Sequence, residues 1–275
     1  DRNSKGISQS EATFSNLSNE IWLVTDKDNE FQRLAAMNLN TKKTTYYTSD
    51  NPWNVESFNL SEDKKSIVFI NNEGGLNKMY LMNTGTKAYK EIKNLPIGLI
   101  SGARFTKNNQ TIFFNQSTAQ SASDVYQLNI KTAKIERWTE SELGEMQPSD
   151  MSVPKFIEWK SFDDLKISGF YYPASPKFKG KRPVIIMIHG GPEGQSMASF
   201  LDSNNFYTSE MGVSLVYPNV RGSSGFGKTY LEKDNGFLRE DSVKDIGALL
   251  DWIAKQPEVD KDKIMIMGRS YGGYM

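Results

Sequence analysis

Cysteine is absent from the 275-residue sequence, and histidine occurs only once, at position 189. The lack of cysteine excludes disulfides, thiol nucleophiles and cysteine-based zinc sites. A single histidine likewise excludes a metal centre built from several histidines. Because cysteine-free proteins occur in reducing and in oxidising compartments, the cytoplasm, the periplasm and secretion all stay open as locations.

An excess of charge of either sign is also missing, since Lys+Arg and Asp+Glu both number 33. This balance argues against nucleic acid and anionic membranes as partners. The longest apolar run, near Val184–Ile188, is far shorter than the roughly 20 residues of a membrane-spanning helix. We therefore predict neither a nucleic-acid partner nor a membrane span, while a homo-oligomer stays open. The sequence begins with Asp1 rather than Met, so we expect the natural N-terminus and any targeting segment to be missing.

The first part of the sequence repeats itself about every 45 residues. Asn38, Asn83 and Asn129 recur at this spacing, and each is followed three positions later by threonine. Segments 67–70 and 111–114 are rich in β-branched and aromatic residues, which favour strands. This period is typical of four-stranded β-propeller blades, with the Asn-x-x-Thr element as a hairpin turn within a blade. A β-sandwich with coincidental spacing is the alternative.

The pattern changes after a polar stretch that contains proline, near residues 145–150. Apolar strand-like runs then alternate with a helix-like segment, which predicts a doubly wound, largely parallel sheet covered by helices. Asp241 or Ser242 is expected to cap that helix. The predicted strands are 155–159, 167–172, 183–188, 213–217 and 264–267, and the predicted helix spans 243–253.

Residues Gly268 to Gly272, with the sequence Gly-Arg-Ser-Tyr-Gly, match the G-x-S-x-G pattern of a nucleophile elbow. The pattern follows the run 264–267, which we expect to be a buried strand. A serine on such a tight strand-to-helix turn is held clear of the sheet, and the two glycines let the backbones approach each other. Ser270 is therefore the candidate nucleophile.

A second element, His189-Gly-Gly-Pro192, directly follows another apolar run, where an α/β-hydrolase keeps its oxyanion loop. We predict that the backbone N–H groups of Gly191 and Tyr271 stabilise the oxyanion; a plain Gly-Gly turn is the alternative. His189 is not the predicted general base, because the triad of this fold runs Ser, Asp, His along the chain. We expect it to order its own loop. The triad Asp and His are expected beyond Met275, so these 275 residues alone should be inactive.

A third element, the glycine-rich segment Asn219–Gly227, follows the next predicted strand. Its glycines suit a tight loop at the rim of an active site. For Arg221, within this segment, a structural ion pair and a contact with substrate both stay open.

These three elements together resemble the prolyl oligopeptidase family of serine peptidases, in particular its acylaminoacyl-peptidase and dipeptidyl-peptidase-like branch. The run Ser270–Met275 is the most specific part of the resemblance. The resemblance implies an α/β hydrolase behind an all-β propeller, with short peptides as substrates and no cofactor or metal. On this basis residues 1–145 are expected to form a partial propeller of about three blades, and residues 150–275 the N-terminal half of the hydrolase domain.

Two other functions fit the same sequence elements. An esterase or lipase-like hydrolase would use the same elbow and oxyanion loop. A non-catalytic binding protein on a hydrolase scaffold would keep the fold without the triad. A propeller favours the peptidase because it restricts access by size, whereas a lipase needs an apolar lid.

Overall fold

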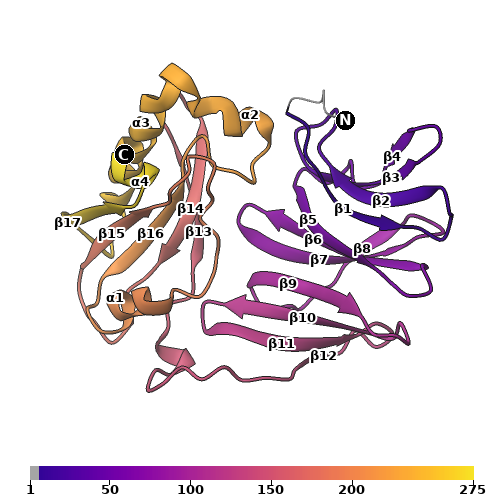
Figure 1. Cartoon of the computed structure of the whole chain (residues 1–275). Helices are drawn as coiled ribbons and strands as arrows, with labels where there is room; N and C mark the ends of the chain where they lie inside the picture. The colour runs from indigo at the N-terminus through magenta and orange to yellow at the C-terminus, as the bar shows by residue number, and fades with distance from the viewer. Residues whose placement is uncertain (1–5) are drawn as a thin grey trace. The chain divides into compact units, whose positions relative to one another are not determined.

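The computed structural model describes residues 6–275 and divides into two compact units. The first unit contains residues 6–116 and Ser123–Glu140, and the second contains Ser117–Ala122 and Ser141–Met275. The first unit is all β, while the second combines a sheet with helices (Figure 1).

The first unit consists of three four-stranded sheets, one for each sequence repeat. Within each sheet the strands lie in chain order, so that neighbours along the sequence are neighbours in the sheet. The sheets are β1 (Gln9–Phe14), β2 (Glu20–Thr25), β3 (Arg33–Asn38) and β4 (Thr44–Tyr46); β5 (Asn54–Leu60), β6 (Ser66–Glu73), β7 (Leu76–Asn83) and β8 (Tyr89–Glu91); and β9 (Gly98–Phe105), β10 (Thr111–Thr118), β11 (Ser121–Asn129) and β12 (Ile135–Arg137).

The recurring asparagine makes the same turn in all three sheets. The side-chain oxygens of Asn38, Asn83 and Asn129 each accept hydrogen bonds from the backbone N–H groups two and three residues later, at 2.9–3.1 Å. The asparagine ends the third strand of each sheet and the fourth strand follows, so the predicted hairpin turn within each repeat is confirmed.

Successive sheets share apolar cores. One core joins the first and second sheets through side chains such as Trp22 and Phe69, both buried. A second core joins the second and third sheets through Ile70 and Phe114. Each sheet therefore buries its apolar face against the next, as the blades of a propeller do.

The second unit is built on a five-stranded sheet with the order β13-β14-β16-β15-β17. β15 runs parallel to both β16 and β17, while β13 with β14, and β14 with β16, are antiparallel. The first two predicted strands form an antiparallel hairpin, with its turn at Asp164. The elements are β13 (Lys155–Lys160), β14 (Lys166–Tyr172), β15 (Arg182–Ile188), β16 (Ser214–Asn219), β17 (Val259–Gly268), α1 (Asn205–Ser209), α2 (Lys228–Leu231), α3 (Arg239–Ile253), α4 (Tyr271–Tyr274) and four 3₁₀ turns, Pro148–Asp150, Asp202–Asn204, Glu232–Asp234 and Gly236–Leu238.

Helix α3 covers one face of this sheet. Its buried residues Ile246, Leu249 and Ile253 form a core with strand residues such as Ile186 and Val216. The predicted cap is wrong, because α3 already begins at Arg239 after a 3₁₀ turn, with Leu238 at the N-cap position and no side-chain capping bond. Asp241 and Ser242 therefore lie within the first turn of the helix.

The predicted strand over residues 264–267 is present as the C-terminal part of β17. Among the described residues β17 pairs only with β15, which makes it an edge strand. Met265 is 54% exposed and Ile266 is 44% exposed. The described residues supply β17 with one neighbouring strand, so burial of both faces of this strand in the full-length protein stays a prediction.

Candidate active site

Ser270 lies on a sharp turn between β17 and α4. Its backbone has φ 56° and ψ −122°, a conformation that L-residues other than glycine rarely adopt. The strand ends at Gly268 and the helix begins at Tyr271, so only two residues make the turn. Strain of this kind persists where the surrounding structure enforces it, and it concentrates at functional sites.

The two glycines of the motif sit at close backbone contacts. A Cβ atom on Gly268 would overlap the carbonyl group of Gly272. A Cβ atom on Gly272 would overlap the carbonyl oxygen of Ile188, at the end of β15. The glycines therefore let the turn fold back on itself and let α4 pack against the neighbouring strand.

The His189–Pro192 loop lies beside this turn. A Cβ atom on Gly190 would lie 3.4 Å from Ser270 Cβ and 3.9 Å from Ser270 Oγ, so Gly190 is in contact with the serine. Gly191 has φ 137°, and a Cβ there would come within 2.5 Å of the backbone nitrogens of Glu193 and Gly194. Tyr271, as the first residue of α4, has a backbone N–H without an intrahelical acceptor.

The ring of His189 is held by its own loop and by the third sequence element. Nδ1 lies 2.7 Å from the Gly190 carbonyl oxygen and donates to it, and Nε2 lies 2.9 Å from Ser223 Oγ. Burial lowers the pKa of His189 below its ordinary value, which outweighs the opposing effects of the Gly190 carbonyl and the charge of Asp234. The imidazole is therefore neutral at pH 7 and both nitrogens are engaged.

Arg221 makes structural ion pairs. Its guanidinium donates to Asp245 at 2.8 Å and to Asp163 at 2.9 Å, and its side chain is only 4% exposed. Asp245 is completely buried on α3, and Asp163 lies in the turn between β13 and β14. The sequence left a structural ion pair and a contact with substrate open as roles of Arg221, and this geometry matches the structural ion pair.

Sequence reasoning missed a buried polar cluster under the elbow. The Tyr271 hydroxyl donates to Asp234 Oδ2 at 2.8 Å and lies 2.6 Å from Ser242 Oγ. Asp234 and Tyr271 are 37 residues apart in sequence. No motif marks the aspartate, so no local pattern predicts the contact.

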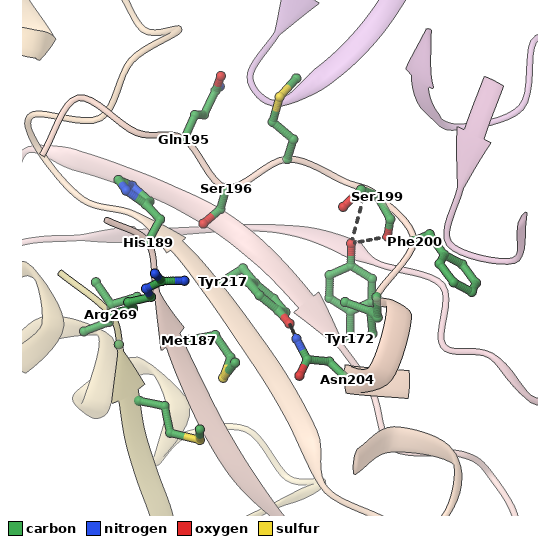
Figure 2. Close-up of a pocket in the computed structure, with 15 residues that line it drawn as sticks. Tyr172, Met187, His189, Gln195, Ser196, Ser199, Phe200, Asn204, Tyr217 and Arg269 are labelled. Atoms are coloured by element: carbon green, nitrogen blue, oxygen red, sulfur yellow. Dashed lines mark hydrogen bonds between the residues drawn. The ribbon is translucent and has the colours of Figure 1, made fainter. Parts of the chain in front are cut away.

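A cavity of about 480 Å³ adjoins the elbow through Gly268 and Arg269. The tyrosine hydroxyls at its wall are fixed: Tyr172 accepts from the Ser199 N–H, and Tyr217 accepts from the Asn204 amide. Figure 2 shows these residues around the cavity together with Arg269. The lining includes Tyr172, Met187, Phe200, Leu201, Tyr217, Met267 and Arg269.

Across residues 6–275, no group of three or more His, Asp or Glu side chains is arranged to hold a metal ion. In the same part of the chain, no helix has the length and hydropathy needed to cross a membrane.

The fold and the nucleophile elbow define the class of protein. Propeller-type sheets come first along the chain, and part of an α/β-hydrolase-type sheet follows them. Residues 199–275 match the family model described as the prolyl oligopeptidase family, and this segment carries the elbow. The predicted resemblance to this family, over residues 199–275, and the predicted fold class are therefore confirmed.

Curated relatives agree with this assignment. Dipeptidyl-peptidase 5 of Porphyromonas gingivalis is 24% identical over 262 residues, which cover 92% of this chain and 37% of the relative. Acylamino-acid-releasing enzyme 1 of Oryza sativa is 34% identical over 99 residues, covering 36% of this chain and 13% of the relative. The chain thus spans little more than a third of the length of the first of these relatives and less of the second.

Solved structures show the same fold. A puromycin hydrolase has a TM-score of 0.86 at 17% identity, covering 98% of this chain and 42% of that structure. Prolyl oligopeptidase B of Galerina marginata has a TM-score of 0.85 at 15% identity, covering 98% of this chain and 38% of that structure. At such identities the likeness establishes the fold alone.

Proposed function

We propose that this chain is part of a serine peptidase that cleaves short oligopeptides through an acyl-enzyme at Ser270. The observation that carries the proposal is the backbone of Ser270, held at φ 56° on the turn between β17 and α4 with Gly190 in contact with it. A serine so placed is accessible to a substrate carbonyl, and an N–H-bearing loop adjoins it.

In the proposed reaction Ser270 Oγ attacks the scissile carbonyl carbon while a general base takes its proton. The negative charge that develops on the carbonyl oxygen is stabilised by the N–H groups of Gly191 and Tyr271, each contributing about 10²- to 10³-fold in kcat. The C–N bond then breaks, and the amine leaves with the proton that the base took from Ser270. Water, activated by the same base, then attacks the acyl-enzyme ester, which releases the carboxylic acid product and restores the Ser270 hydroxyl.

The general base is assigned to a histidine outside these 275 residues. His189 is the only histidine here, and its two ring nitrogens are engaged by Gly190 and Ser223. The chain spans 37% of the length of dipeptidyl-peptidase 5, so most of a protein of that size lies outside it. We propose that the triad Asp and His both belong to that part, and that this chain alone is inactive.

Peptides are the proposed substrates for two reasons. The relatives in sequence are named for releasing dipeptides and acylamino acids. The cavity beside the elbow is large enough for one bulky side chain, and its walls include three tyrosine or phenylalanine rings and three methionine thioethers. Arg269 places a positive charge at the same cavity.

The test is the hydrolysis of aminoacyl- and dipeptidyl-arylamides by the full-length protein. Ser270→Ala should lower kcat by more than about 10⁴-fold, because no other group can form the acyl-enzyme. Ser203→Ala, a serine that is exposed in the 3₁₀ turn Asp202–Asn204, is the matched control and should retain wild-type rates. Equal activity of the two variants would overturn the proposal.

A further inference from the structure

We infer that Asp234 is a positioning residue, which acts through the Tyr271 side chain to fix the backbone N–H next to Ser270. The inference rests on the proposed function, in which this N–H stabilises the oxyanion. It assigns a role to a buried carboxylate that the catalytic steps above do not use.

The contact between the two residues is buried and well formed. Asp234 is 1% exposed, and the Tyr271 hydroxyl donates to its Oδ2 at 2.8 Å. Since the carboxylate can only accept, the proton of the tyrosine is committed to it, and Ser242 Oγ lies 2.6 Å from the tyrosine oxygen. Burial raises the pKa of Tyr271 to about 12, so the hydroxyl remains a donor at every pH at which a peptidase works.

Stability alone does not account for a carboxylate at this place. The second oxygen, Asp234 Oδ1, is buried and has no hydrogen-bond partner within residues 6–275. A buried carboxylate with an unsatisfied oxygen destabilises the fold relative to an apolar side chain of the same shape. Buried groups that are costly in this way concentrate at functional sites.

The third sequence element leaves room for this carboxylate. Gly222 has φ 89°, and a Cβ atom there would overlap the carboxyl group of Asp234. Any larger residue at position 222 would push the aspartate away from Tyr271. One glycine of the segment Asn219–Gly227 is thus explained by its contact with Asp234 rather than by contact with substrate.

Helix α3 holds the other side of the tyrosine. The Arg239 guanidinium lies 5.0 Å from the centroid of the Tyr271 ring, and Ser242 is on the same helix. The ring is therefore fixed at its tip by Asp234 and Ser242 and at its face by Arg239. Because a peptide N–H moves with its own Cα, a side chain fixed in this way restrains the N–H of Tyr271, and misplacement of such a group by about 1 Å can lower the rate about 100-fold.

The experiment compares Tyr271→Phe and Asp234→Asn with the control Tyr274→Phe in the full-length protein. Tyr274 lies three residues along the same helix, is 59% exposed and stacks on Tyr271 at 5.8 Å between centroids. The measurements are kcat and KM on a peptide arylamide, inhibition by a peptide boronate that forms a tetrahedral adduct with the serine, and inhibition by the product peptide. Fluorophosphonate labelling of Ser270 is measured in the wild type.

We expect Tyr271→Phe to lower kcat about 10- to 100-fold and to weaken boronate inhibition by a similar factor. Asp234→Asn should lower both by less, because the amide oxygen of asparagine can still accept from the tyrosine hydroxyl. KM and product inhibition should stay within about twofold, and the double variant should be no worse than Tyr271→Phe alone, since both changes act on one hydrogen bond. Tyr274→Phe should behave as wild type.

Normal labelling of Ser270 with unchanged kcat and boronate inhibition in Tyr271→Phe would overturn the positioning role and leave the proposed function intact. A lower melting temperature without a change in kcat per folded molecule would mean a purely structural role and would equally overturn it. No labelling of wild-type Ser270 would overturn the proposed function and this inference together. Tyr271→Phe decides the question even where Asp234→Asn fails to fold.

Discussion

The adjacent glycines Gly272 and Gly273 in helix α4 differ sharply in the space around them. A Cβ on Gly272 would overlap the backbone of Ile188, whereas the nearest atom to a Cβ on Gly273 is the Gly268 oxygen at 3.4 Å. The close approach of α4 to β15 therefore depends on position 272 and not on position 273.

This difference predicts opposite outcomes for the same substitution. Gly272→Ala should lower the free energy of unfolding by about 2–3 kcal/mol, the range of a forced backbone shift, and should displace Ser270. Gly273→Ala should be neutral or slightly stabilising because alanine favours a helix. Urea unfolding of the full-length protein measures both; equal stabilities would contradict the contact that we describe at Gly272.

The residues of the site differ in how far the sequence reveals them. Ser270 and its glycines form a contiguous motif whose spacing follows from the geometry of one turn, so the sequence was sufficient to single them out. Asp234 reaches Tyr271 only through the packing of the 3₁₀ turn Glu232–Asp234 against α4. Contacts between distant segments leave no local pattern, and this one could not be predicted.

At the scale of elements, the buried Arg221 ties the β13–β14 turn to helix α3. It donates both to Asp163 in that turn and to Asp245 on the helix. By contrast, Lys160 pairs with Asp164 beside the same turn in an ion pair whose side chains are 76% and 83% exposed. Burial, rather than the presence of an ion pair, should determine which of the two matters.

We predict that Arg221→Met destabilises the protein by about 3–5 kcal/mol, because it leaves the buried carboxylate of Asp245 without its cation. Lys160→Met should change stability by less than about 1 kcal/mol, since exposed ion pairs contribute little. Chemical denaturation of both variants gives the comparison. A loss below 1 kcal/mol for Arg221→Met would show that the ion pair does not hold these elements together.

Elements were predictable where a repeat or a period marks them, and less so at their ends. The turns at Asn38, Asn83 and Asn129 follow from local hydrogen bonding and were found in the sequence. The start of α3 was misplaced because a 3₁₀ turn, Gly236–Leu238, leads directly into it.

At the scale of the whole molecule, the resemblance to the family implies a propeller that restricts substrates by size. We predict that the full-length protein cleaves flexible peptides and that its rate falls steeply beyond roughly 30 residues, because only an extended chain can reach an enclosed site without unfolding. The measurement uses peptides of increasing length that share one cleavage sequence, and a folded protein that carries it in a loop. Equal rates across this series would exclude a size-restricting propeller and favour an open esterase-like site.

The role of Ser270 as the nucleophile is tested most directly by labelling the full-length protein with a fluorophosphonate and identifying the modified peptide by mass spectrometry. We expect a single labelled serine, Ser270, because its strained position between β17 and α4 presents Oγ to an incoming phosphorus or carbonyl centre. Label on the peptide that contains Ser270, and its loss in Ser270→Ala, is the predicted result. Label on another serine, or none on the folded wild-type protein, would contradict the assignment of Ser270 as the nucleophile.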